Sequence, residues 1–131
     1  MSFGERNYDR QKPEIDFPEH DVPEDLVIED LIVGDGREVK AGDGISAHYV
    51  GVAFSTGEEF DASWNRGQPL DFTAGVGQVI EGWDRGLIGM KAGGRRRLEI
   101  PSHLAYGERG AGAGIGSNEA LIFVVDLVSV R

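Results

Sequence analysis

The sequence predicts an α+β protein in which one antiparallel sheet of five to six strands folds over one short helix. Segments with strand-like patterns far outnumber helical ones, and the connections between them suit hairpins and loops. The 20 glycines among 131 residues are about twice the average usage, which favours tight turns and bent strands over a helical bundle. A chain of this length fits a single domain.

Six segments have the apolar patterns and turn boundaries of strands: residues 26–36, 45–54, 58–63, 69–75, 94–101 and 120–130. In the fifth segment, Leu98 and Ile100 share one face and charged residues occupy the other. The last segment is apolar at its odd positions from Leu121 to Leu127, and its even positions are also apolar except at Asp126. We therefore expect a central strand that is covered, at least partly, on both sides.

One segment, residues 79–90, has the spacing of a helix. The residues predicted to share its apolar face are Ile80, Trp83, Leu87 and Met90. Gly82 and Gly86 each cost a helix about 1 kcal/mol relative to alanine. The helix must therefore be held in place by packing against the sheet.

The first 25 residues are predicted to form an acidic N-terminal tail, and residues 26–131 the folded domain. The net charge is −10, and residues 1–30, with ten acidic and three basic side chains, contribute −7 of it. High charge and frequent proline disfavour a packed core, so the favoured interpretation is a mobile solubilising arm. The alternative is a strap across the sheet face away from the helix. Ile15 and Phe17 would then dock over Ile122 and Val124, with burial of Phe17 providing most of the binding.

Composition excludes several kinds of site. The chain has no cysteine, so disulfides, thiol nucleophiles and cysteine-ligated zinc are ruled out. The three histidines are widely spaced, and we expect neither a metal site nor a cofactor. No serine-nucleophile elbow, P-loop or dinucleotide motif is present, and the glycine-rich residues 110–116 are interpreted as a flexible loop.

Charge and hydropathy also limit the partners. An acidic chain is poorly suited to neutralise phosphates, so we expect no nucleic-acid binding. The basic run Arg95–Arg97 is interpreted as a solvated strand face. No run of 18 apolar residues predicts a membrane span, and the polar N-terminus does not resemble a signal peptide. We expect a cytoplasmic monomer.

Six aromatic residues come from six separate predicted elements: Tyr49, Phe60, Phe72, Trp83, Tyr106 and Phe123. They can be ordinary core residues, since aromatic side chains dominate cores. They can equally line a concave apolar pocket with a few polar tips, the usual form of a ligand site. Spacing does not decide between the two. A lone Asp61 is more often a turn or ion-pair residue than a general base.

Motifs in the same order as in a known family favour the pocket. They are HYVG at 48–51, EEFDAS at 58–63, QVIEGWDRGLIGMKAGGRRRLEIP at 78–101, LAYGERG at 104–110 and LIFVVDLV at 121–128. Through them the chain resembles the small single-domain FKBP-type peptidyl-prolyl cis-trans isomerases over residues 26–131. The resemblance implies a half-barrel sheet around the helix, with a proline-binding pocket between the two. It also implies an isomerase, or rotamase, that assists protein folding without a cofactor.

The resemblance assigns site residues by motif. The substrate-binding residues it implies are Tyr49, Phe60, Leu70, Phe72, Val79, Ile80, Trp83, Ile115 and Phe123. Trp83 would form the pocket floor, and Asp61 and Tyr106 are the implied catalytic residues. The implied hydrogen-bond donors to substrate are the Tyr106 hydroxyl and the backbone N–H of Ile80. Leu70 stands where the family often has an aromatic residue, and residues 110–114 predict a more mobile loop.

The partners implied are X-Pro segments of unfolded or flexible proteins, together with FK506- or rapamycin-like macrolides. One alternative is a module that binds proline segments or macrolides, with catalysis incidental. Another is a chaperone-like protein that holds unfolded chains. The short connection from Tyr106 to Leu121 has no inserted domain, which argues against that second alternative.

Overall fold

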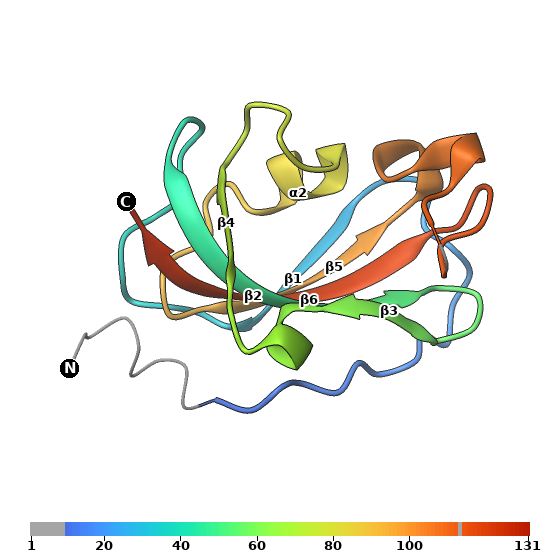
Figure 1. The fold of residues 1–131 in the computed structure, drawn as a ribbon, viewed down its shortest axis with the longest axis horizontal. Coiled ribbons are helices and arrows are strands. Elements are labelled where there is room, and N and C mark those ends of the chain that lie inside the picture. Colours follow the sequence, from blue (N-terminus) through green and yellow to red (C-terminus); the bar gives the residue numbers. More distant parts are fainter. Residues whose placement is uncertain (1–9, 113) are drawn as a thin grey trace.

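A twisted antiparallel sheet with one short helix against its inner face forms the body of the protein (Figure 1). The computed structural model describes residues 10–112 and 114–131. Residues 1–9 of the predicted tail and Ala113 of the predicted mobile loop lie outside the described residues.

All six predicted strands are present. They are β1 (Val27–Ile32), β2 (Gly44–Ala53), β3 (Glu59–Ala62), β4 (Leu70–Thr73), β5 (Arg95–Ile100) and β6 (Leu121–Val130). Single 3-10 turns are η1 (Ser63–Arg66), η2 (Ser102–Leu104) and η3 (Gly107–Arg109). The helix α2 (Glu81–Gly86) is shorter than the predicted segment 79–90. It ends there because Gly89 adopts a positive φ of 85° that no α-helix continues.

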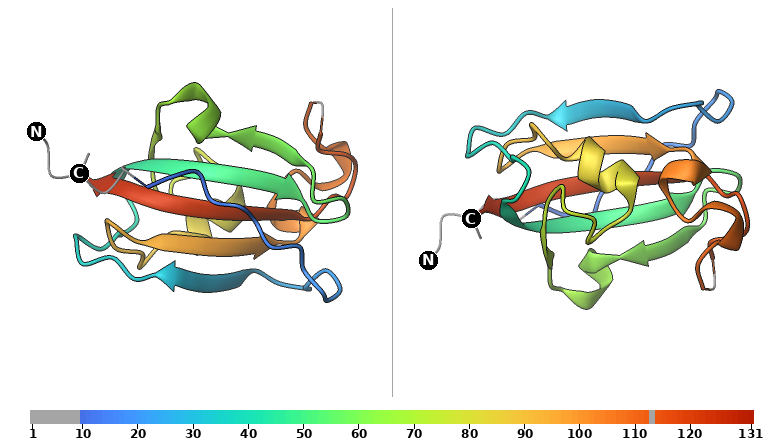
Figure 2. Two further views of the ribbon diagram at one scale, coloured as in Figure 1. Left: turned by 90° about the horizontal axis from the view of Figure 1, so that it is seen from below. Right: turned by 90° about the horizontal axis from the view of Figure 1, so that it is seen from above.

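The strand order is β1-β5-β6-β2-β3, and β4 pairs with β2 beside β3. Every pairing is antiparallel, and β6 lies between β5 and β2 as the central strand that its apolar sequence predicts. The sheet curves around α2 without closing, as the two views in Figure 2 show. The predicted α+β half-barrel is confirmed.

The main core lies between α2 and the inner face of the sheet. Leu121, Phe123, Val125 and Leu127 all belong to it, so the odd positions of β6 face the helix as predicted. Leu98 and Ile100 of β5 are fully buried in the same core. The alternation along each strand thus decides which side chains reach the helix.

The arginines at 95–97 do not form the solvated face that their sequence suggests. Their ion pairs are Arg95–Asp126 at 2.9 Å, Arg96–Asp30 at 2.7 Å and Arg97–Glu99 at 3.1 Å. Arg96 is buried on the helix side and donates to the carbonyl of Gly86 at 2.8 Å. The interpretation was wrong because acidic partners, most of them far away in the sequence, lie beside each guanidinium in the fold.

The tail lies across the outer face of the sheet, opposite α2 (Figure 2, left). Ile15 packs on a second apolar cluster formed by Val52, Phe54, Ala120 and Ile122. Arg10 donates to the carbonyl of Gly93 at 2.7 Å. The strap alternative therefore describes residues 10–24, and the mobile arm is wrong for them. Phe17, however, is 60% exposed, so Ile15 and not Phe17 provides the apolar anchor.

An ion pair of His20 predicts that the docking of this strap depends on pH. Its Nε2 lies 3.2 Å from Oε1 of Glu99, a buried carboxylate on β5. The hydrogen bond to the Asp21 carbonyl, and then the charge of Glu99, raise the pKa of His20 above 6.5, while nearby Arg97 opposes this. A raised pKa means that the attraction is fully present below pH 6.5 and is lost as the pH rises through the folded-state value.

We therefore expect the strap near His20 to loosen from the sheet as the pH rises. An NMR titration that follows the amide and ring signals of residues 15–22 and Phe54, whose ring centroid lies 5.9 Å from that of His20, measures this. A His20→Gln variant should lack the transition. Identical titration curves for the two proteins would refute the role of His20.

Candidate functional site

An aromatic cavity of about 180 Å³ opens between α2 and the inner face of the sheet. Its lining comes from strands, from the helix and from the loop before β6. The lining residues are Tyr49, Phe60, Asp61, Leu70, Gln78, Val79, Ile80, Trp83, Tyr106 and Phe123. Mostly apolar walls with a few polar tips are the usual form of a small-molecule or side-chain binding site.

Trp83 is the fixed centre of this cavity. The indole is 4% exposed and meets the rings of Tyr49 and Phe123 edge-on, each with centroids 5.2 Å from its own. Its backbone N–H donates to the carbonyl of Ile80 at 2.9 Å, which fixes the first turn of α2. Edge-to-face contacts of this kind hold the rings in defined orientations.

Gly51 on β2 leaves room for two walls of the cavity. Phe60 and Phe123 meet edge-on at 5.5 Å between centroids. A Cβ at Gly51 would lie 2.5 Å from Cζ of Phe60 and 2.7 Å from Cε1 of Phe123. Neither ring could keep its place beside any other residue at this position. The glycine is visible in the HYVG motif, but its reason is visible only in three dimensions.

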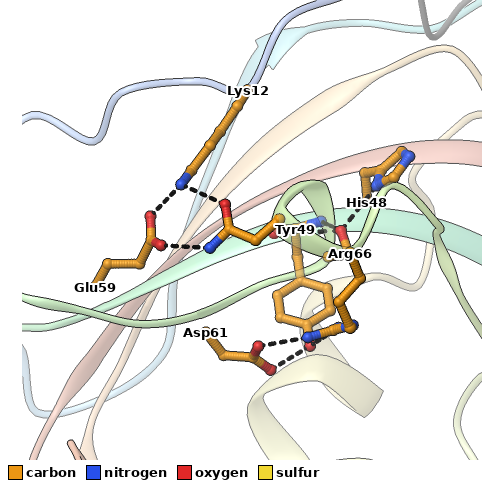
Figure 3. A network of polar contacts seen from close by, with 8 residues as sticks. Lys12, His48, Tyr49, Glu59, Asp61 and Arg66 are labelled. Atoms are coloured by element: carbon orange, nitrogen blue, oxygen red, sulfur yellow. Dashed lines mark hydrogen bonds and ion pairs between the residues drawn. The ribbon is translucent and has the colours of Figure 1, made fainter.

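A hydrogen-bonded triad forms the polar rim of the cavity (Figure 3). The Tyr49 hydroxyl donates to Oδ2 of Asp61 at 2.5 Å, and Arg66 donates to Oδ1 of Asp61 at 2.7 Å. Arg66 also donates to the Tyr49 hydroxyl oxygen at 2.8 Å. The carboxylate, the phenol and the guanidinium therefore hold one another in a closed ring of hydrogen bonds.

The triad keeps Asp61 charged at neutral pH. Burial raises the pKa of Asp61, but the hydrogen bonds from Tyr49 and Arg66 outweigh it and lower the pKa below its ordinary value. Burial, followed by the neighbouring Asp61, raises the pKa of Tyr49, so the phenol keeps its proton. The rim thus presents a fixed carboxylate whose two oxygens are already occupied by donors.

Besides the buried Nε1 of Trp83, two donors of cavity-lining residues have no partner in the described part of the chain. No described residue accepts a hydrogen bond from the Tyr106 hydroxyl or from the backbone N–H of Ile80. Tyr106 is 40% exposed, and burial followed by the charge of Asp61 raises its pKa, so its hydroxyl remains a donor. Both groups are available to a carbonyl that enters the site.

Two residues predicted for the pocket do not line the cavity. Phe72 of β4 is buried and packs against Trp83, with centroids 5.6 Å apart, as part of the core. Ile115 is also buried in the core, because its loop turns back and its carbonyl accepts from the N–H of Ala111 at 2.9 Å. The fold brings the other nine predicted residues together around the cavity.

Sequence reasoning missed Arg66 and Gln78. Arg66 lies in η1, just after the EEFDAS motif, and nothing in its local sequence indicates that it turns back to Asp61. Gln78 precedes the predicted helix, and its Oε1 accepts from the backbone N–H of Thr73 at 2.9 Å. The glutamine is the first residue of the motif at 78–101, which is a sequence signal that Arg66 lacks.

Residues 10–112 and 114–131 hold neither a metal cluster nor a helical membrane span. No group of three or more His, Asp or Glu side chains there could hold a metal ion. None of the helices in that part is long and apolar enough to span a membrane.

The chain matches the family model described as "FKBP-type peptidyl-prolyl cis-trans isomerase" over residues 35–128. It is 65% identical over 121 residues to "FK506-binding protein" of Streptomyces anulatus, which covers 92% of this chain and 98% of that protein. It is 49% identical over 90 residues to "Peptidyl-prolyl cis-trans isomerase FPR2" of Saccharomyces cerevisiae, covering 69% and 67%. The crystal structure of AtFKBP13 matches with a TM-score of 0.75 and 42% identity, covering 81% of this chain and 93% of that one.

Proposed function

This chain belongs to the FKBP-type peptidyl-prolyl cis-trans isomerases, and we propose from this that its aromatic cavity binds the proline of an X-Pro segment and speeds rotation about the preceding bond. The observation that supports the site most directly is Trp83 at the base of the cavity, framed edge-on by two rings. In this proposal the proline ring packs against the indole, and the rotation needs no nucleophile, acid or metal.

The reaction requires only that a barrier be lowered. Resonance gives the peptide C–N bond a rotational barrier of about 18–20 kcal/mol. The two isomers of an X-Pro bond differ by only about 0.5–1 kcal/mol. At the twisted transition state resonance is lost and the imide becomes less polar. An apolar cavity therefore binds the twisted imide better than the planar one, and this preference lowers the barrier to rotation.

Polar groups at the rim complete the proposed mechanism. The Ile80 N–H and the Tyr106 hydroxyl donate to carbonyls that flank the proline, and so hold the segment in a turned geometry. Asp61, fixed by Tyr49, faces the rotating imide as a charged group that needs no reorganisation during the reaction. Each 1.36 kcal/mol by which these contacts favour the twisted state gives a tenfold increase in rate.

A Tyr106→Phe variant tests the second donor. It removes one hydroxyl and little volume, so kcat/KM for an X-Pro peptide should fall about two- to tenfold, the value of one hydrogen bond. A protease-coupled isomerisation assay measures the rate, and a thermal melt checks that the fold is unchanged. Full activity in the variant would remove Tyr106 from the mechanism.

The same cavity is proposed to bind FK506- or rapamycin-like macrolides. The name of the Streptomyces relative supports this. The apolar cavity also supports it, because the Tyr106 hydroxyl and the Ile80 backbone N–H are available to donate hydrogen bonds to a ligand. The alternative, a binding module in which turnover is incidental, predicts tight macrolide binding without acceleration of a proline-limited refolding reaction. Acceleration that a macrolide abolishes supports the isomerase. The cytoplasmic location and the monomeric state stay predictions, which cell fractionation and gel filtration can test.

A further inference from the structure

The edge strand β3 carries two site residues but is weakly held by the sheet itself. It has four residues, and its register with β2 shifts between Gly51 and Val52. Phe60 and Asp61 both depend on the position of this short strand. A strand with so few ladder hydrogen bonds and one free edge needs other contacts to stay in place.

A triangle of polar contacts between the strap, β3 and η1 provides such additional contacts (Figure 3). Lys12 Nζ lies 2.7 Å from Oε1 of Glu59 and donates to Oδ1 of Asn65 at 2.9 Å. Asn65 Nδ2 in turn donates to Oε2 of Glu59 at 2.9 Å. The hydrogen bond from Lys12 is the main cause that lowers the pKa of Glu59, which is therefore ionised at neutral pH. The triangle joins the strap, β3 and η1.

Each residue of the triangle stands close in the sequence to a residue that forms the site or that anchors the strap to the sheet. Glu59 directly precedes Phe60 and Asp61, and Asn65 directly precedes Arg66. On the strap, Lys12 lies between two anchors, Arg10 and Ile15. Arg10 reaches the central strand through Asp126 at 3.3 Å, and Ile15 is packed on the outer apolar cluster. The triangle therefore connects the edge of the cavity to the fixed middle of the sheet.

We propose that Lys12 is a positioning residue for the isomerase reaction, tying β3 and η1 to the anchored strap and so holding Asp61 and Arg66 in their rim geometry. It touches neither the cavity nor the substrate. The role rests on the proposed function of the cavity. In its absence β3 and η1 sample more arrangements, and the fraction of molecules ready to bind a proline segment falls.

The test uses the full chain and compares Lys12→Met with Lys40→Met. Both variants remove one exposed ammonium, but the side chain of Lys40 makes no polar contact with the described residues of the strap, β3 or η1. Lys12→Met should lower kcat/KM about two- to fivefold, mainly through a higher KM, because a half-exposed ion pair contributes little more. Lys40→Met should match the wild type, and Lys12→Arg should restore most of the loss.

Salt and amide exchange separate positioning from a general loss of stability. Raising the ionic strength screens the Lys12–Glu59 pair, so the wild type and Lys40→Met should lose rate while Lys12→Met changes less. Amide exchange in β3 and η1 should quicken in Lys12→Met, with β5 and β6 unchanged. Unaltered exchange in β3, or faster exchange with full kcat/KM, would overturn the proposal.

Failure of the proposed function would look different. If the wild-type chain does not isomerise X-Pro peptides at all, the proposed function falls, and the positioning role falls with it. If the wild type is active and Lys12→Met is equally active at every salt concentration, only the role of Lys12 is refuted.

Discussion

Replacing Asp61 with valine will lower kcat/KM for X-Pro peptides about 10- to 100-fold. In the proposed mechanism the charged Asp61 favours the twisted imide, and a contact to a charged group contributes about 1.5–3 kcal/mol, which corresponds to one to two powers of ten in rate. The variant leaves the Arg66 guanidinium and the Tyr49 hydroxyl without their shared acceptor at the rim. It also removes the fixed negative charge that the proposed mechanism places beside the rotating imide.

A matched control is Asp35→Val, which removes an exposed carboxylate from the turn between Gly34 and Gly36. This turn is far from the triad in the sequence, and Asp35 makes no hydrogen bond or ion pair with a triad residue. A protease-coupled assay compares the rates, and thermal melts should show both variants folded at the assay temperature. A rate for Asp61→Val within twofold of the wild type would show that the triad only supports the cavity.

Replacing Gly82 with alanine will destabilise the protein by a net of up to about 2 kcal/mol. Helix propensity alone predicts the opposite sign, a gain of about 1 kcal/mol. In the fold, however, a Cβ at Gly82 would lie 2.5 Å from Cγ2 and 2.7 Å from Cδ1 of Ile100. Ile100 is fully buried and has nowhere to go, so overpacking, at about 1–3 kcal/mol, outweighs the propensity.

Urea unfolding of Gly82→Ala measures this difference, with Gly116→Ala as the control. A Cβ added at Gly116 would have no atom within 4 Å, and the residue has no positive φ, so its variant should be neutral or up to about 1 kcal/mol more stable. A Gly82→Ala protein as stable as the wild type would mean that the helix can move away from the sheet at no cost.

The strands were predictable because side-chain alternation is a local property that the fold preserves. The odd positions of β6 from Leu121 to Leu127 and the pair Leu98 and Ile100 face the helix as their spacing indicates. The position of the helix was also predictable, but its end was not, since Gly89 and the carbonyl contacts of Arg96 terminate it. Neither effect follows from the apolar period of the segment.

The site residues also divide into those that the sequence predicts and those that only the fold reveals. The motifs predicted most of the cavity, including Trp83, because these residues stand in a fixed order along the chain. Arg66 escaped prediction because its role depends on η1 folding back toward Asp61. Ile115 was misplaced because its loop returns to the core, which the glycine-rich sequence does not indicate.

The sequence by itself determined the strand pattern, the helix face and the aromatic set of a prolyl isomerase, because each depends on residues close together in the chain or on a motif of the family. Only the tertiary structure decided which groups pair across long separations: Arg95 of β5 with Asp126, Ile15 with the outer cluster, and Lys12 with Glu59. Such contacts depend on which strands become neighbours and how far the strap reaches. Both depend on how the whole chain folds, and no local sequence pattern encodes them.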